Sequence, residues 1–311
     1  MQCSFSLCGR MMISLVILLE MATSLMNDLF ENPTTKCKDI SPQLPPSLPP
    51  AVYDYAYGES IQEWGDISPF CNGKLQSPIA LYTKSSMPVA NVPPLFLSGS
   101  RQNPKKVTVQ NTGKTVMYEF EFLRPIIARG AALDGEFQFN HIHFHWGSTS
   151  DEGAEHEVNG QRFPLEMHLV FFNKIYGTIE NAMPSSNGLA VIGVIFQIDE
   201  RSNVTYPWLT PMANVRLAGT IYKLPNPAAF NVDALIGSTR THYFSYKGSL
   251  TNPPCYETVT WMVMRKRLPV REDQLATFRA LLQSYGQPLV NNHRPLRELN
   301  GRRVLLYRGS V

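Results

Sequence analysis

The sequence predicts a single domain built mainly from β-strands. Many short runs rich in β-branched and aromatic residues are broken by glycine, proline and asparagine, a pattern typical of strands joined by turns. Helical periodicity is scarce, and neither an internal repeat nor a second shift in composition divides the chain. At 311 residues, 43% of them hydrophobic, the chain is long enough to bury one large core.

The clearest strand signals lie between residues 106 and 264. They are Lys106–Asn111, Val116–Phe122, Phe137–Trp146, Met167–Phe172, Leu189–Ile198 and Thr258–Met264. One amphipathic helix is expected over Arg271–Leu282, because acidic residues stand near its start and apolar residues recur at a spacing of three to four.

The first 52 residues are expected to lie outside this domain. Arg10 precedes the apolar run Met11–Leu19, which has the length of a signal-peptide core and falls short of the ~20 residues that span a bilayer. We therefore predict a signal peptide over residues 1–24. Glu20 ends the apolar run abruptly, however, and an uncleaved anchor is the alternative. Residues 25–52 contain SPQLPPSLPP and predict a Pro-rich arm, which leaves residues 53–308 as the folded domain.

The mature protein is expected to be secreted and extracellular, without a membrane span. The formal charge of +3 is small, and no run of like charges forms a basic stripe, so nucleic acid is not an expected partner. Loss of the leader would leave Cys37, Cys71 and Cys255, which in an oxidising compartment predicts one disulfide and one leftover thiol. Asn203 begins an Asn-x-Thr acceptor for N-glycosylation.

Alternating histidines are the main chemical signal. His141, His143 and His145 alternate with apolar residues, so a strand would place three imidazoles on one face. Glu166 and His168 lie in the run FPLEMHLVFF, which indicates another strand, so their side chains share a face. If the two strands are neighbours, three histidines can hold one zinc ion and leave its fourth position to water, as in an open catalytic site. For each histidine taken singly, simple packing against a sheet face is the alternative.

Five segments strongly resemble the α-class carbonic anhydrases: FNHIHFHWGS, GAEHEVNGQRFPLEMHLVFF, GLAVIG, KGSLTNPPCYETVTW and NNHRP. The likeness runs from about Tyr53 to Leu306, nearly the whole expected domain. It implies the α-carbonic-anhydrase fold, a large, twisted, mostly antiparallel sheet of about ten strands with a few short helices and a zinc site in a conical cleft. It also implies an enzyme that converts carbon dioxide and water reversibly to bicarbonate and a proton.

The resemblance assigns the central residues of the site. The Zn²⁺ ligands fall on His143, His145 and His168, and carbonic anhydrase is the standard case in which zinc lowers the pKa of a bound water to about 7. Thr251 falls on the family's gatekeeping threonine and Glu155 on its partner carboxylate. If Thr251 donates its only proton to ionised Glu155, it can only accept from the zinc-bound hydroxide, which orients that nucleophile toward carbon dioxide.

The resemblance also assigns the groups around the ligands. Glu166 is expected to accept the free ring N–H of His168, and the backbone carbonyl near Asn292 that of His145, with His156 in the same outer group. The expected pocket for carbon dioxide is apolar, although core packing explains its residue types equally well. It consists of Val170, Val191, Leu250, Val259 and Trp261.

Two positions depart from the usual family pattern. His141 stands where the ring partner of His143 is usually glutamine; a neutral imidazole can still accept that hydrogen bond, which predicts a working site with a pH-sensitive partner. Lys114 stands where fast members export the proton through a histidine. A lysine with its ordinary pKa of about 10.4 is already protonated at neutral pH, so we expect turnover to be limited by proton export. Burial or positive neighbours would partly relieve this limit by lowering the lysine's pKa.

The same resemblance also predicts a disulfide and the ligands of the site. Cys71 and Cys255 match two cysteines that pair in extracellular members, while Cys37 stays free or links two chains into a dimer. The expected ligands are carbon dioxide and bicarbonate, with sulfonamides or anions as inhibitors. Two alternatives stay open: a catalytically silent carbonic-anhydrase-like binding domain, although such relatives have usually lost a zinc histidine, and an ester hydrolase that uses the same hydroxide.

Overall fold

The computed structural model describes residues 56–57, 61, 63–90, 93–130, 132–236 and 241–308. The chain divides into two units, Met1–Pro46 and Ser47–Val311, and every described residue belongs to the second. The expected signal peptide, the Pro-rich arm and Cys37 lie outside the described residues. Among the helices that are described, none is both long enough and apolar enough to cross a bilayer.

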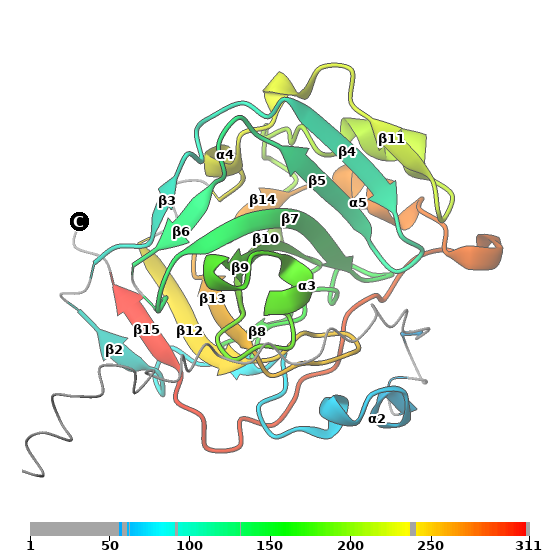
Figure 1. The fold of residues 1–311 in the computed structure, drawn as a ribbon. Helices are drawn as coiled ribbons and strands as arrows, with labels where there is room; N and C mark the ends of the chain where they lie inside the picture. The colour runs from blue at the N-terminus through cyan, green and yellow to red at the C-terminus, as the bar shows by residue number, and fades with distance from the viewer. Residues whose placement is uncertain are drawn as a thin grey trace, which may run out of the picture. The chain divides into compact units, whose positions relative to one another are not determined.

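One large sheet dominates the second unit (Figure 1). It holds 13 strands within the described residues, and ten of them follow one another in the order β11-β4-β5-β7-β9-β10-β13-β12-β15-β2. In that order they are Ile221–Lys223, Lys106–Asn111, Val116–Glu121, Phe137–Trp146, Leu165–Asn173, Leu189–Ile198, Val259–Met264, His242–Gly248, Leu305–Arg308 and Met87–Val89.

The remaining strands branch from this path. β3 (Phe96–Ser98) pairs with β6 (Ile127–Arg129), β6 also pairs with β7, and β14 (Leu268–Val270) pairs with β10. A separate two-stranded sheet joins β1 (Ala80–Leu81) to β8 (Glu157–Val158). Within the large sheet most neighbours are antiparallel, and the parallel pairs among the described strands are β10–β13, β10–β14 and β15–β2. The predicted fold class is therefore confirmed.

The helices are short. They are α2 (Trp64–Ile67), α3 (Ile179–Ala182), α4 (Val232–Ile236) and α5 (Glu272–Arg279), with 3-10 turns at Pro69–Asn72, Lys174–Tyr176, Thr210–Val215, Pro227–Ala229 and Ser284–Gly286. The helix expected to run to Leu282 ends earlier, at Arg279. After it, the backbone N–H of Leu281 donates to the carbonyl of Phe278, three residues back, and that of Leu282 donates to the carbonyl of Arg216, so the i to i−4 ladder is not continued.

The central strands are buried on both faces. Alternate residues of β9 and β10 belong to two apolar clusters: Leu169 and Ile192 lie in the larger one, Val170 and Val191 in the smaller one. Because successive residues of a strand project to opposite faces, the two clusters occupy the two sides of the sheet. This double burial explains why these strands read as nearly continuous hydrophobic runs.

A bulge in β7 decides which face its histidines use. Phe139 and Ile142 both pack in the larger apolar cluster, although strict alternation would send them to opposite faces. The register between β7 and β9 shifts between Phe139 and His141, which makes Asn140 the extra residue of a β-bulge. After the bulge, even-numbered residues face the larger cluster and the histidines project to the other side.

Candidate metal centre

Histidines from two neighbouring strands meet in the middle of the large sheet. β7 and β9 pair in antiparallel register, with His143 opposite His168 and His145 opposite Glu166. Directly opposite residues of antiparallel strands project to the same side, so this register places the side chains as neighbours. On the other edge of β9, Gly193 of β10 stands opposite His168.

Three ring nitrogens converge at this point. The ligand atoms of His143, His145 and His168 lie within 4.8 Å of one another, and His143 Nε2 is 3.2 Å from His168 Nδ1. Nitrogens at 2.0–2.1 Å from a tetrahedral zinc ion are separated from each other by about 3.3 Å. The spacing of these two nitrogens therefore matches a shared zinc ion.

The opposite nitrogen of each ring has its own partner. His145 Nδ1 donates to the backbone carbonyl of Asn292 at 2.7 Å, and His168 Nε2 donates to Glu166 Oε1 at 2.9 Å. His143 Nδ1 lies 3.1 Å from His141 Nε2. A neutral imidazole has one N–H, so donation through these atoms leaves a lone pair on His143 Nε2, His145 Nε2 and His168 Nδ1.

These three lone pairs fit a metal ion. His145 Nε2 is buried and has no hydrogen-bond partner among the described residues. His143 Nε2 and His168 Nδ1 would face each other across 3.2 Å with a lone pair on each, a repulsive arrangement that a cation between them would relieve. The described residues place no fourth protein ligand in this group, which leaves room for a water or a substrate.

Burial keeps the histidines neutral. It lowers the pKa of His145 to about 4, and burial with repulsion from His168 lowers the pKa of His141 to about 4. Burial also holds the pKa of His143 well below its ordinary value and lowers the pKa of His168. Neutral imidazole is the form that binds a metal. His141 was predicted to make the site pH-sensitive. With its pKa lowered to about 4, it should become protonated only below pH 5.

Glu166 anchors a second group of ionisable side chains. Its Oε2 accepts the backbone N–H of His156 at 2.9 Å, and its Oε1 accepts from His156 Nδ1 at 2.7 Å and from His168. Burial by itself would raise the pKa of Glu166, but His156 and His168 together hold it well below the ordinary range. His156 Nε2 lies 2.7 Å from the hydroxyl of Tyr246, which lies 3.0 Å from Ser77 Oγ.

This second group also has metal-binding atoms within 4.8 Å of one another, in His156, Glu166 and His168. Its donors and acceptors already satisfy one another through short hydrogen bonds, so a metal here would have to break them. The His143–His145–His168 cluster has inward-facing lone pairs instead. That cluster is therefore the better candidate for a metal site, and Glu166 is hydrogen-bonded to one of its members, His168.

Glu155 is buried beside the cluster. Its Oε1 accepts the backbone N–H of Arg294 at 3.0 Å, whereas its Oε2 has no regular hydrogen-bond partner among the described residues and can accept from Thr251. Burial raises the pKa of Glu155 to about 7, while His168, the Arg294 N–H and the Thr251 hydroxyl each act to lower it. A nearby cation would further favour the carboxylate.

A row of apolar side chains lies next to the histidines. Val191 of β10 stands opposite Val170 of β9 on one side and opposite Trp261 of β13 on the other, so the three side chains form one row across the sheet. The Trp261 ring lies 4.8 Å from the ring of His168. Val259 belongs to the same apolar cluster and Leu250 packs against it, so all five predicted pocket residues lie in or against this cluster.

Lys114 lies in the turn that connects β4 and β5 and is half-buried. Its backbone carbonyl accepts from the amide of Asn292 at 3.0 Å, and the carbonyl of Asn292 in turn accepts from His145. Asn292 therefore connects Lys114, at the expected proton-export position, to His145, a predicted metal ligand.

The predicted disulfide between Cys71 and Cys255 is present, with the Cα atoms 4.9 Å apart. Arg294, which sequence reasoning missed, lies between this bond and Glu155. Its guanidinium donates to the carbonyl of Cys71 at 3.3 Å and to Gln76 Oε1 at 2.8 Å, and its side chain is 2% exposed. The segment NNHRP, which carries Arg294, was the only sequence signal for it.

Sequence reasoning also missed Asn140, which contacts His141, and Tyr246, which contacts His156. It missed Ser77 as well, whose hydroxyl contacts Tyr246. For Asn140 the sequence does hold a signal: apolar residues of β7 alternate up to Phe139 and resume at Ile142, one residue out of register, which indicates a bulge. For Tyr246 and Ser77 no local pattern exists, because their contacts join segments far apart in the chain.

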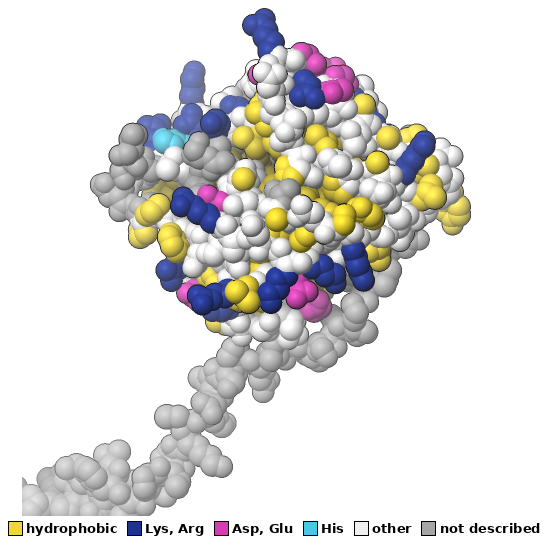
Figure 2. Space-filling model, turned by 90° about the horizontal axis from the view of Figure 1, so that it is seen from above, with side chains coloured by type: hydrophobic (Ala, Val, Ile, Leu, Met, Phe, Trp, Pro, Cys, Tyr) yellow, Lys and Arg dark blue, Asp and Glu magenta, His cyan; other side chains and the backbone are white. Residues whose placement is uncertain are grey.

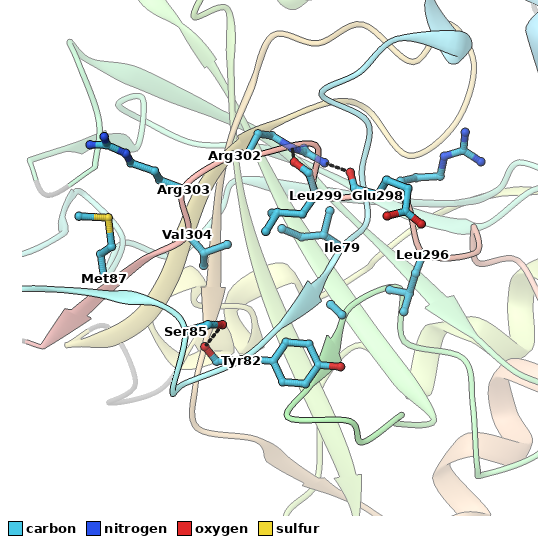
Figure 3. A pocket seen from close by; sticks show the side chains of 12 residues that line it. Ile79, Tyr82, Ser85, Met87, Leu296, Glu298, Leu299, Arg302, Arg303 and Val304 are labelled. Carbon is cyan, nitrogen blue, oxygen red and sulfur yellow. Dashed lines mark hydrogen bonds between the residues drawn. The ribbon is translucent and has the colours of Figure 1, made fainter.

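Other surface features lie apart from the histidines. Asn203 is exposed in the segment after β10. A pocket of about 460 Å³ is lined by residues of β1, β2 and the segment 296–304, including Tyr82, Leu299 and Arg302 (Figure 3). None of the predicted site residues lines this pocket. On the face drawn in Figure 2, lysine and arginine side chains are dispersed and do not form a continuous stripe.

Comparison with known proteins gives a consistent answer. The family model for eukaryotic-type carbonic anhydrase matches residues 59–308. The chain is 32% identical to human carbonic anhydrase 3 and 33% identical to human carbonic anhydrase 7, each over 258 residues that cover 81% of this chain and 96% of the relative. It is 34% identical to carbonic anhydrase 6 of Mus musculus over 256 residues, which cover 81% of this chain and 78% of the relative.

Proposed function

We propose, from the premise that this chain belongs to the eukaryotic-type carbonic anhydrase family, that it catalyses the reversible hydration of carbon dioxide to bicarbonate and a proton. The observation that carries the proposal is the convergence of His143 Nε2, His145 Nε2 and His168 Nδ1, each with its other ring nitrogen already engaged. Zinc held by three imidazoles supplies a Lewis acid and, from water, a nucleophile at neutral pH.

Thr251 and Glu155 orient the attacking oxygen. Ionised Glu155 can only accept hydrogen bonds, and its Oε1 already accepts from Arg294. Thr251 therefore directs its single proton to Glu155, and Thr251 Oγ1 can then only accept a hydrogen bond from the attacking oxygen. This fixed direction turns a lone pair of that oxygen toward the substrate carbon, which lowers the entropic part of the barrier.

The row formed by Val170, Val191 and Trp261 holds the substrate. Carbon dioxide has no net dipole and no hydrogen-bond donor, so an apolar wall binds it without competition from ordered water. The row begins at His168, because the Trp261 ring lies 4.8 Å from the imidazole. Substrate bound there is next to the three converging nitrogens.

Proton export sets the turnover rate in this proposal. Each hydration event leaves one proton to be carried from the site to solvent, and a protonated lysine cannot accept it. Lys114 is the residue at the position that the family resemblance assigns to this step. Carbon dioxide hydration should therefore be slow without a small diffusible base and faster with one.

The direct test combines metal content with stopped-flow carbon dioxide hydration, with and without a zinc-binding sulfonamide. We expect about one zinc per chain and hydration that the sulfonamide inhibits. His145→Ala should lose both zinc and hydration, while His242→Ala, a histidine of β12 outside the cluster, should keep both. Zinc at full occupancy with no hydration would instead favour the silent binding domain.

We also propose that the protein is secreted and glycosylated. A disulfide in the folded unit is typical of an oxidising compartment, and exposed Asn203 within an Asn-x-Thr sequence is accessible to the glycosylation machinery. Expression in a secretory cell line should yield medium-borne protein that lacks its N-terminal leader. A glycosidase should lower its mass, and Asn203→Gln should abolish that change. On non-reducing gels, Cys37→Ser would remove any dimer linked through Cys37.

A further inference from the structure

We propose that Asn140 is a positioning residue for the metal centre: its amide oxygen holds His141 in the tautomer that lets His143 present Nε2 to a metal ion. This inference rests on the proposed zinc site and adds a residue that no family motif assigns. Asn140 Oδ1 lies 2.6 Å from His141 Nδ1, and His141 Nε2 lies 3.1 Å from His143 Nδ1.

The direction of these hydrogen bonds follows from donor and acceptor chemistry. A carbonyl oxygen such as Asn140 Oδ1 can only accept, so His141 Nδ1 carries the proton. His141 Nε2 then has the lone pair and accepts from His143 Nδ1–H. The remaining nitrogen of His143, Nε2, is left deprotonated and faces His168 and the predicted metal position.

The opposite tautomer of His141 would disable the ligand. If His141 carried its proton on Nε2, that N–H would point at His143 Nδ1 and force His143 to accept there. A neutral His143 would then carry its own proton on Nε2, where the metal should bind. A glutamine at position 141 has no tautomers, and it accepts the hydrogen bond when its amide oxygen is turned toward His143 Nδ1. A histidine needs a neighbour that selects the tautomer.

The bulge in β7 brings that neighbour within reach. In a regular strand Asn140 and His141 would project to opposite faces of the sheet. Because the bulge inserts Asn140 between Phe139 and His141, both side chains lie on the side away from the larger apolar cluster. The strand irregularity and the unusual histidine therefore belong to one arrangement.

The test measures zinc affinity and ring tautomer, neither of which depends on carbon dioxide hydration. Asn140→Ala should weaken zinc binding about tenfold, the low end of the cost of losing an outer partner of a metal ligand. Asn140→Asp keeps an acceptor oxygen and should restore affinity to within about threefold of wild type. Gln138→Ala, a neighbouring polar residue of β7, is the matched control and should bind zinc normally.

A double-mutant cycle separates positioning from a general structural role. In a His141→Gln background, Asn140→Ala should have no further effect on zinc affinity, because no tautomer remains to be selected. In the metal-free protein, ¹⁵N NMR of His141 should show the Nδ1–H form in wild type and a mixture of forms in Asn140→Ala. An equal loss of affinity in both backgrounds, or an unchanged His141 tautomer, would overturn the inference.

Failure of this inference is distinguishable from failure of the proposed function. Wild-type protein that binds zinc but does not hydrate carbon dioxide would refute the function and leave the tautomer result valid. Active enzyme whose zinc affinity is indifferent to Asn140 would refute the positioning role alone.

Discussion

Gly193→Ala should damage the metal centre although the new methyl group touches no predicted ligand. A Cβ atom at residue 193 would lie 2.8 Å from Glu166 Oε1 and 3.5 Å from a methyl carbon of Val263. Ordinary contacts begin near 3.4 Å, so about 0.6 Å must be recovered by movement. Glu166 Oε1 cannot yield freely, because it accepts from His156 at 2.7 Å and from His168 at 2.9 Å.

The expected magnitude follows from those contacts. Overpacking of a buried site typically costs about 1–3 kcal/mol, which in a domain of this size corresponds to a fall of about 2–12 °C in the melting temperature. Displacing Glu166 also disturbs the partner of His168 Nε2, a change that typically weakens metal binding about 10–100-fold. Differential scanning calorimetry of the metal-free protein and competition titration with a zinc chelator measure the two effects.

The same substitution at Gly65 is the control. Gly65 lies in α2, and the three atoms nearest to a Cβ there all belong to the exposed side chain of Asn72, which can move away. Gly65→Ala should therefore leave zinc affinity unchanged. If Gly193→Ala retained both the wild-type melting temperature and the wild-type zinc affinity, Glu166 would not be held as rigidly as its hydrogen bonds indicate, and the reasoning would be wrong.

Four further predictions concern proton release on zinc binding, the pH dependence of stability, the hydration rate and the disulfide. Zinc binding at pH 6 should release about one proton, because a pKa of about 7 leaves Glu155 mostly protonated until a cation binds nearby. Titration calorimetry in two buffers of different ionisation enthalpy should detect the released proton, and Glu155→Gln should abolish the release. In the metal-free protein Glu155 should contribute a loss of stability as pH rises from 4.5 through 7, because its raised folded-state pKa favours folding only while the group keeps its proton. The buried histidines, whose pKa is lowered, act in the opposite direction, so the contribution is measured as the difference in urea midpoint between wild type and Glu155→Gln; a difference that stays constant over that window would contradict it. Imidazole buffer, or Lys114→His, should accelerate hydration severalfold, and an indifferent rate would exclude proton export as the limit. Replacing Cys71 and Cys255 by serine should lower the free energy of unfolding by up to about 5 kcal/mol, as the bond closes a loop with a sequence separation of 184, and an unchanged urea midpoint would count against it.

Local patterns in the sequence were sufficient for the strands that build the site. The predicted bounds of β4, β7 and β10 coincide with the observed ones, because side-chain alternation and β-branched composition act within a single strand. Strand β9 was also predicted, but it runs from Leu165 to Asn173 and so exceeds the predicted Met167–Phe172 at both ends. The same alternation placed His143 and His145 on one face. It also contained the phase slip between Phe139 and Ile142 that marks the bulge, a signal that a strictly alternating interpretation overlooks.

The sequence alone thus determined the strand pattern, the alternating histidines and, through family resemblance, the residues expected to act together. The resemblance implied acceptors such as the carbonyl of Asn292, but only the tertiary structure showed which ring nitrogen each acceptor engages and which one is left facing inward. It likewise decided that Arg294 connects Glu155 to the disulfide and that Tyr246 contacts His156. Hydrogen bonds between distant segments leave no periodic trace in a sequence, because their partners become neighbours only when the sheet has formed.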